Sequence, residues 1–243
     1  MCNKRRQSNY GGGGYTAGID GCEYMQMLPA DVEKQYPDYS LYPQYKEAYG
    51  FLTRGCPRDC SFCIVSQKEG RKSIQVADLH DFWRHQKTIK LLDPNLLACA
   101  DHERLLVQLA ESGAWVDYTQ GLDVRLLDRD VIQLLNQVKC KNIHFAWDNP
   151  SEDLTKQFEL FNKYSTNQDP RKKSVYVLTN HNSTHEQDLY RIYRLKELGY
   201  TPYIMIYEKQ AAPRITRHLA RWVNNKQLFR SVERFEDYDH KIA

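Results

Sequence analysis

From residue 47 onwards, short apolar runs alternate regularly with helical patterns. The runs are rich in β-branched and aromatic residues and are bounded by turn-forming residues, which predicts strands. They cover residues 49–53, 88–92, 115–118, 142–147, 174–178 and 203–207. Six strand–helix units in this order predict an α/β fold with a parallel sheet and helices outside it. Because crossovers are right-handed, such a sheet curls toward a barrel, and six units instead of eight predict an incomplete, open one.

Apolar residues at helical spacing mark the segments between these strands. Asp101 is the expected N-cap of the second helix, Ser151 opens the fourth, and Ser183 with Glu186 forms an expected capping box at the fifth. A sixth helix is expected to begin near Pro213. The apolar stripes of the first five are Leu79, Phe82 and Trp83; Leu105, Leu106 and Leu109; Val131, Leu134, Leu135 and Val138; Leu154, Phe158 and Phe161; and Leu189, Ile192, Leu195 and Leu198.

Three regions follow from these patterns. Residues 1–46 lack periodicity and predict a loop-rich N-terminal arm, residues 47–210 form the predicted core, and residues 211–243 form a basic C-terminal helical segment. We expect the arm to wrap the side or bottom of the core or to cover its open edge. The arm contains four consecutive glycines at 11–14 that no Lys-Ser/Thr pair follows, which favours a flexible turn over a phosphate loop.

Membrane and secreted classes are disfavoured by the distribution of apolar residues. No apolar run approaches the roughly 20 residues that span a bilayer, and no apolar segment follows the basic residues near Met1. We therefore expect a cytoplasmic protein that does not enter a membrane. Its seven cysteines are an odd number, and in a reducing compartment clustered cysteines more often indicate metal or redox chemistry than disulfides.

Three of the cysteines lie within eight residues, directly after the first predicted strand. Cys56, Cys60 and Cys63 have the spacing C-x3-C-x2-C. Three thiolates on one loop can bind three irons of a [4Fe–4S] cube and leave the fourth iron open for a substrate or cofactor. A structural zinc ion and an electron-transfer cluster both require a fourth ligand, which does not occur nearby. A non-catalytic zinc module with a remote fourth ligand and an iron–sulfur electron carrier or scaffold remain as alternatives.

This motif resembles the signature of the radical S-adenosylmethionine (SAM) superfamily, C-x3-C-x-aromatic-C, with Phe62 at the aromatic position. In that superfamily the motif follows strand one of a partial (β/α)6 barrel. Residues 53–57, 92–95 and 120–125 resemble the versions seen in radical SAM cores that often follow a cobalamin-binding domain. The resemblance covers about residues 47–210. Since only 46 residues precede the core and no D-x-H-x-x-G motif occurs, we do not expect cobalamin binding.

The resemblance implies an oxygen-sensitive enzyme with a [4Fe–4S] cluster and SAM as cofactors. SAM chelates the open iron through its amino and carboxylate groups, and the reduced cluster cleaves it to methionine and a 5′-deoxyadenosyl radical. That radical abstracts hydrogen from a substrate, either a small molecule or a macromolecule, which the sequence does not identify. A flavodoxin or ferredoxin is the implied type of reductant.

The resemblance also assigns residues to these roles. Cys56, Cys60 and Cys63 are the implied cluster ligands, and the Phe62 backbone is expected near the adenine of SAM. Asp93 stands where the family has a Gly-Gly-Glu segment that holds the SAM amino group, although both glycines are absent here. Ribose and carboxylate contacts are expected from four residues at later strand ends, namely Asp123, Arg125, Asp148 and Asn180.

Other residues of possible function are weaker candidates. Cys99 lies in an apolar run and is expected in the core, Cys140 is expected to be structural, and His181 follows the fifth strand as a minor site candidate. His80 and His85 are five residues apart, which does not place both on one helical face for a metal pair.

The C-terminal segment is basic, with eight Lys or Arg and four Asp or Glu from residue 209 to the end. Arg214, Arg217 and Arg221 lie on one helical face, with Trp222 and Phe229 nearby. This pattern is typical of a nucleic-acid interface, and it is also typical of an ordinary solvated helix. A nucleic-acid partner and a phosphate-bearing small substrate are therefore two expectations for this segment beside a plain solvated surface.

Overall fold

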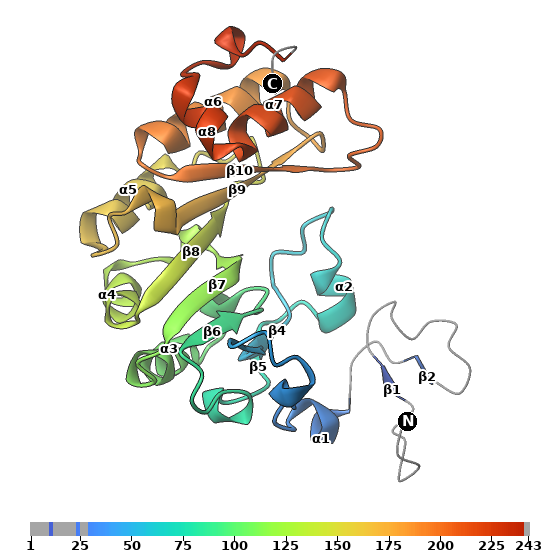
Figure 1. Ribbon diagram of the computed structural model, residues 1–243, viewed down its shortest axis with the longest axis vertical. Helices are drawn as coiled ribbons and strands as arrows, with labels where there is room; N and C mark the ends of the chain where they lie inside the picture. The colour runs from blue at the N-terminus through green and yellow to red at the C-terminus, as the bar shows by residue number, and fades with distance from the viewer. Residues whose placement is uncertain (1–9, 12–22, 25–28, 241–243) are drawn as a thin grey trace.

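The computed structural model describes residues 10–11, 23–24 and 29–240 (Figure 1). Its centre is a six-stranded parallel sheet, which confirms the six predicted strands. In sheet order the strands are β3 (Ala48–Gly50), β6 (Thr88–Leu91), β7 (Trp115–Leu122), β8 (Cys140–Ala146), β9 (Lys173–Thr179) and β10 (Thr201–Ile206). The spatial order therefore follows the chain order, with β3 and β10 at the two edges.

Helices follow the strands and cover one side of the sheet, as Figure 1 shows. They are α3 (His102–Glu111), α4 (Arg129–Gln137), α5 (Thr155–Tyr164), α6 (His185–Glu197) and α7 (Arg214–Asn224), with the short α8 (Lys226–Ser231) after α7. Since each crossover advances to the next strand in the same direction, right-handed connections place successive helices on the same face. The other face of the sheet is left for the segments around α2 (Val65–Glu69).

The first predicted helix is wrong. Residues Leu79–Asp81 form a single 3-10 turn, and the helix between β3 and β6 is α2, which was not expected. The turn closes on itself because the Asp81 carboxylate accepts a hydrogen bond from the Asp78 N–H (2.9 Å). Further along, the Gln86 side-chain oxygen accepts hydrogen bonds from the N–H groups of Arg84 and His85. These two N–H groups are therefore not available for the backbone hydrogen bonds of a helix. Leu79 and Phe82 are nevertheless buried in the core.

Two of the predicted helix starts are also displaced. The helix expected to open at Ser151 begins at Thr155, because the Ser151 N–H donates to the Asn149 side chain in a preceding turn (3.0 Å). The capping box of α6 is formed by Thr184 and Gln187, one residue later than predicted. Asp101 occupies the N-cap position of α3 as expected, without a side-chain capping bond.

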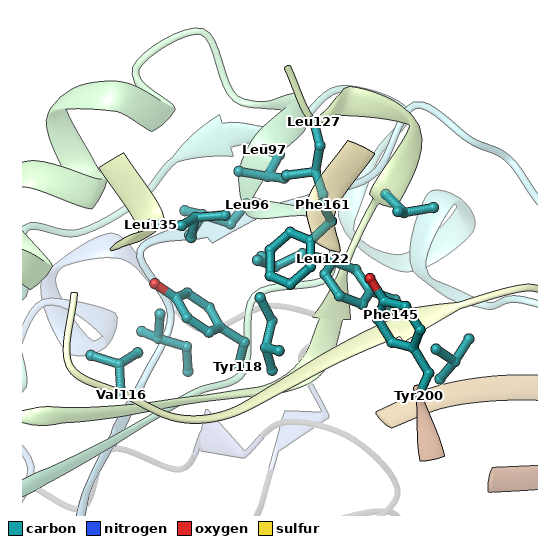
Figure 2. Packing of buried hydrophobic residues seen from close by; sticks show 14 of the residues in the cluster. Leu96, Leu97, Val116, Tyr118, Leu122, Leu127, Leu135, Phe145, Phe161 and Tyr200 are labelled. Atoms are coloured by element: carbon teal, nitrogen blue, oxygen red, sulfur yellow. The ribbon is translucent and has the colours of Figure 1, made fainter. Parts of the chain in front are cut away.

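The hydrophobic core fills the space between the sheet and its helices (Figure 2). Phe145 of β8 packs edge-to-face against Phe161 of α5, with ring centroids 5.0 Å apart, and the Tyr200 ring also packs edge-to-face on Phe145 at 6.1 Å. Cys99 is buried in this core, which confirms its predicted place. Burial of such large apolar side chains supplies most of the driving force for folding.

Residues 29–46 of the N-terminal arm pack beside β3, at one edge of the sheet. After α1 (Ala30–Glu33), Tyr39 donates a hydrogen bond to the Phe82 carbonyl (2.8 Å) and accepts one from the Tyr49 N–H (3.0 Å). Earlier in the arm, β1 (Tyr10–Gly11) pairs in parallel with β2 (Glu23–Tyr24). Residues 12–14 of the glycine run, Cys2 and Cys22 lie outside the described residues.

At the other end, α7 shows which C-terminal residues face solvent. Arg214, Arg217 and Arg221 are exposed, whereas Trp222 and Phe229 are buried and pack against each other at 4.9 Å. These two aromatic rings are core residues and do not lie beside the arginines as a stacking surface. Within the described residues, no helix has the length and apolar character required to cross a membrane.

Candidate functional site

The three clustered cysteines lie on a loop, residues 55–64, that leaves the short strand β4 (Thr53–Arg54) and leads into α2. We call this segment the cysteine loop. The Cys56 N–H donates to the Gly70 carbonyl (3.1 Å), and the Cys63 N–H donates to the Cys60 carbonyl (2.9 Å), which closes a tight turn. After α2 the chain returns as β5 (Ile74–Gln75), which pairs antiparallel with β4. Both ends of the cysteine loop are therefore held by backbone hydrogen bonds.

Gly55 permits the close approach at the start of the cysteine loop. Its φ is +84°, and a Cβ at this position would lie 2.3 Å from the Lys72 carbonyl oxygen. We expect Gly55→Ala to lower the free energy of unfolding by about 2 to 4 kcal/mol, because a positive φ is combined with a backbone clash. The midpoint of urea unfolding measures this.

Gly199→Ala is the matched control for that measurement. Gly199 also has a positive φ, +74°, but a Cβ there would meet no atom within 4 Å. We expect it to lower stability by only about 1 kcal/mol, from the backbone conformation alone. Equal losses in the two variants would show that the close approach at Gly55 is not what the loop requires.

The three thiols are free and partly buried. Burial raises the pKa of Cys60, and the nearby Cys56, Asp148 and Cys63 raise it further. The Asn95 side-chain N–H donates to the Cys56 sulfur at 3.6 Å, while the Asn95 Oδ1 is buried with no hydrogen-bond partner among the described residues. Three soft thiolates with an amide donor to one sulfur suit an iron–sulfur cluster.

A single metal ion fits this donor set less well. The described part of the chain contains no group of three His, Cys, Asp or Glu side chains placed to hold one ion. Three cysteines that bind different corners of a four-iron cube are spread more widely than the ligands of one tetrahedral zinc ion.

A network of four charged side chains holds the cysteine loop over the ends of other strands. Arg58 lies between Cys56 and Cys60, and its guanidinium is 3.4 Å from the Glu152 carboxylate and 3.9 Å from that of Asp123. Arg125 binds the same two carboxylates, at 2.6 Å to Asp123 and 2.8 Å to Glu152. We call these four residues the charge network. It joins the loop to the segments that follow β7 and β8.

A second contact reaches the end of β9. The Ser61 hydroxyl and the His181 Nε2 are 2.9 Å apart, and the Phe62 ring packs edge-to-face on the His181 ring at 5.5 Å. The loop that follows the edge strand β3 thus extends across the carboxyl ends of β7, β8 and β9. This contact makes His181 part of the site, although the sequence indicated it only as a minor candidate.

The predicted residues at later strand ends take different positions. Asp123 is nearly buried, receives the Arg125 N–H and guanidinium, and so belongs with Arg125 to the charge network. Asp148 lies near Cys60 and accepts the Leu178 N–H (3.2 Å), and burial raises its pKa. Asn180 has a φ of +62°, and its side chain donates to the Tyr207 carbonyl (2.8 Å), which ties the ends of β9 and β10 together.

Asp93 is buried and fully engaged by the protein. Its Oδ1 accepts hydrogen bonds from the Thr53 N–H (2.5 Å) and hydroxyl (2.7 Å), and both oxygens accept from the Leu52 N–H (3.1 and 3.2 Å). These bonds turn the chain away from β3 and end the first strand at Gly50, earlier than predicted. The contact of Asp93 with a SAM amino group stays a prediction. The side-chain contacts given above join Asp93 to Leu52 and Thr53, just before the cysteine loop.

The burial of Asp93 predicts a pH dependence. Desolvation raises its pKa to about 6, from an ordinary value of 3.8. The folded chain therefore binds this proton more tightly than the unfolded chain, so protonation of Asp93 adds to the free energy of unfolding. This contribution is complete below about pH 4 and is lost as the pH rises through about 6. Relative to Asp93→Asn, we expect the free energy of unfolding to fall by about 3 kcal/mol across that window. Parallel pH profiles of the two proteins, measured by urea unfolding, would contradict it.

A large cleft lies below the cysteine loop, on the face of the sheet away from the helices. Its volume is about 920 Å³, and Phe62, Cys63 and Asp148 line its upper end. Its walls come from inward-facing residues of four strands, among them Thr119, Asn142, His144, Ser174, Tyr176, Tyr203 and Met205. Sequence reasoning missed these residues. The sequence does contain a sign of them, because polar or aromatic side chains occupy every second position of β8 and β9. A strand that is covered on both faces carries apolar side chains on both.

Comparison with known proteins does not place the chain in a family. No protein-family model matches the chain, and no curated protein shows significant similarity to it.

Proposed function

We propose that this protein is a radical SAM enzyme that generates a 5′-deoxyadenosyl radical and uses it on a substrate bound in the cleft. The observation that carries the proposal is the position of the cysteine loop. Cys56 and Cys63 are close enough to Cys60 to raise its pKa, the motif supplies three cysteines, and Cys63 lines one end of the cleft. We further propose that the six-stranded sheet is a partial (β/α)6 barrel with this cleft as its interior.

In this proposal Cys56, Cys60 and Cys63 hold a [4Fe–4S] cluster. When bound, the cluster supplies the electron for reductive cleavage of SAM. The Asn95 amide hydrogen bond to Cys56 stabilises the negative charge on that sulfur, a contact of the kind that tunes cluster potential. Phe62 and Asp148 line the upper end of the cleft, where an apolar ring and a carboxylate are available to SAM.

The charge network keeps the loop in place over the cleft. Arg58 and Arg125 are both paired with Asp123 and Glu152, so the loop is held at its middle as well as at its two ends. The enzyme also requires an external one-electron reductant such as a flavodoxin or ferredoxin. We also propose a reducing, cytoplasmic location, where clustered cysteines more often serve metal or redox chemistry than disulfides.

Anaerobic reconstitution with iron and sulfide tests the proposal. We expect a brown protein with about four irons per chain that, with dithionite, converts SAM to 5′-deoxyadenosine and methionine. A colourless protein that retains one zinc ion would replace the proposal with the zinc-module alternative. A brown protein that accepts electrons and leaves SAM intact would replace it with an electron carrier or scaffold.

A further inference from the structure

The cleft has a chemical character that the proposed function does not by itself require. Its volume of about 920 Å³ extends from Cys63 at one end to the start of β9 and β10 and the α7–α8 junction at the other. Aromatic, polar and basic side chains occupy different parts of its wall. Their arrangement indicates the class of molecule that the cleft accepts.

One wall presents aromatic and soft apolar surface. The Tyr176 and Tyr203 rings meet edge-to-face at 6.0 Å, and the His144 ring stacks flat on Tyr176 at 5.3 Å with an angle of 3° between the planes. Tyr203 is 44% exposed and Met205 is 47% exposed, although both lie within β10. Solvent-accessible aromatic rings at the mouth of a cleft are suited to stacking on a planar heterocycle.

The floor carries a row of hydrogen-bonding groups on adjacent strands. The Ser174 hydroxyl binds the His144 Nδ1, and the His144 Nε2 lies 3.5 Å from the Asp117 carboxylate. The Asn142 amide donates to the other Asp117 oxygen at 3.1 Å. His144, Asn142 and Ser174 all line the cleft, so this row offers both donors and acceptors to the edge of a heterocycle.

The end away from the cysteines is basic. Lys172 and Lys226 line it together with Arg171, whose guanidinium is paired with Asp169 (2.8 Å). Asp148, at the opposite end, is the acidic residue among the described lining residues. Lys226 also belongs to a run from residue 209 to 230 that contains six Lys or Arg and no Asp or Glu. Cations grouped at one end of a cleft favour an anionic group there, and phosphate is the anion that Lys and Arg most commonly bind.

We propose that the cleft binds a nucleobase that carries phosphate, with the base against Tyr203 and Tyr176 and the phosphate toward Lys172 and Lys226. The proposal rests on the proposed function, since it names the substrate class of that enzyme. In this position the nucleotide lies between the basic end of the cleft and the cysteine loop. A free nucleotide and a nucleotide within a single strand share this chemistry, and the exposed Arg214, Arg217 and Arg221 on α7 offer further phosphate contacts to a strand.

Binding measurements with the full-length protein test it directly. The probes are the four ribonucleoside monophosphates and a short fluorescein-labelled single-stranded RNA at low salt. Fluorescence anisotropy measures binding of the labelled RNA strand, and its displacement by each monophosphate measures binding of that monophosphate. We expect Tyr203→Leu to weaken binding about ten-fold and Tyr203→Phe to restore it, because a phenyl ring retains the stacking face. Tighter binding of the strand identifies a polynucleotide, and equal binding of a monophosphate identifies a free nucleotide.

A charge-matched pair of variants separates the cleft from general attraction. Lys172→Gln with Lys226→Gln removes two cations from the cleft, whereas Lys156→Gln with Lys163→Gln removes two exposed ones from α5. For the strand, we expect the first pair to reduce the slope of log affinity against log salt by about 1.4 and the second to leave it nearly unchanged. No binding of any probe, or equal losses in the two pairs, would overturn the proposal.

This assay is independent of the test of the proposed function. Binding is measured without SAM or reductant, and SAM cleavage is measured without nucleotide. SAM cleavage without nucleotide binding removes only the substrate assignment. Nucleotide binding without SAM cleavage removes the radical SAM proposal and leaves a nucleotide-binding cleft.

Discussion

Cys60→Ala is expected to abolish both the visible absorbance of the reconstituted cluster and all formation of 5′-deoxyadenosine. Cys60 is the central cysteine of the motif, and both of the others contribute to the rise of its pKa, so its thiol lies within their electrostatic range. With three protein ligands and one open iron, the cluster has no substitute ligand from the described residues of the loop. Iron content, the visible spectrum and SAM turnover measure the loss.

Cys99→Ala and Cys140→Ala are the matched controls for that result. Cys99 is buried in the core, and burial raises the pKa of Cys140 to about 12, so neither thiol is a ready ligand. Both variants are expected to retain the cluster and the activity. Full SAM cleavage by Cys60→Ala, or loss of the cluster in either control, would contradict the assignment of the three ligands.

The second large effect is expected at Arg191, which is buried beneath the site. Its guanidinium donates to the carbonyls of Trp147 (2.6 Å) and Leu178 (2.9 Å) and to the Asp188 carboxylate (2.5 Å), with 1% of its side chain exposed. One side chain therefore joins the carboxyl ends of β8 and β9 to α6. We expect Arg191→Met to lower the free energy of unfolding by about 3 to 5 kcal/mol, because Asp188 is left charged, buried and unpaired.

A control and a rescue variant test that explanation. Arg194, one turn further along α6, pairs with Glu159 and Glu197 at the surface, and Arg194→Met is expected to lower stability by less than about 1 kcal/mol. The double variant Arg191→Met with Asp188→Leu removes both charges and is expected to recover part of the loss. Urea unfolding measures all three. A double variant that is less stable than Arg191→Met alone would show that the carbonyl contacts, not the unpaired charge, dominate.

The charge network and Arg191 show where prediction from the sequence reached its limit. Asp123, Arg125 and Asp148 were expected at the site because the family resemblance implies ligand contacts from residues at these strand ends. Glu152 and Arg58 were not singled out, since neither lies at a strand end in the sequence pattern. Their role depends on how far the cysteine loop reaches across the sheet, which no local pattern encodes.

The displaced elements have a similar cause. Hydrophobic periodicity located all six strands because each is a short apolar run between breakers. It could not place the end of the first strand, which is set by the Leu52 and Thr53 N–H groups turning to the Asp93 carboxylate some forty residues later. It also did not locate the cleft, because polar and aromatic side chains at every second position show that one face of a strand is not apolar but do not show what that face encloses.

The sequence by itself determined the alternating strand–helix order, the three-cysteine motif and the core positions such as Cys99. These depend on spacing along the chain, and spacing of two or of about three and a half residues is a local property. Only the tertiary structure decided that Ser61 and Phe62 meet His181, that Asp93 holds the backbone before the cysteines, and that a basic and aromatic cleft lies below them. Those contacts join residues that are far apart in sequence, so they exist only once the strands have paired.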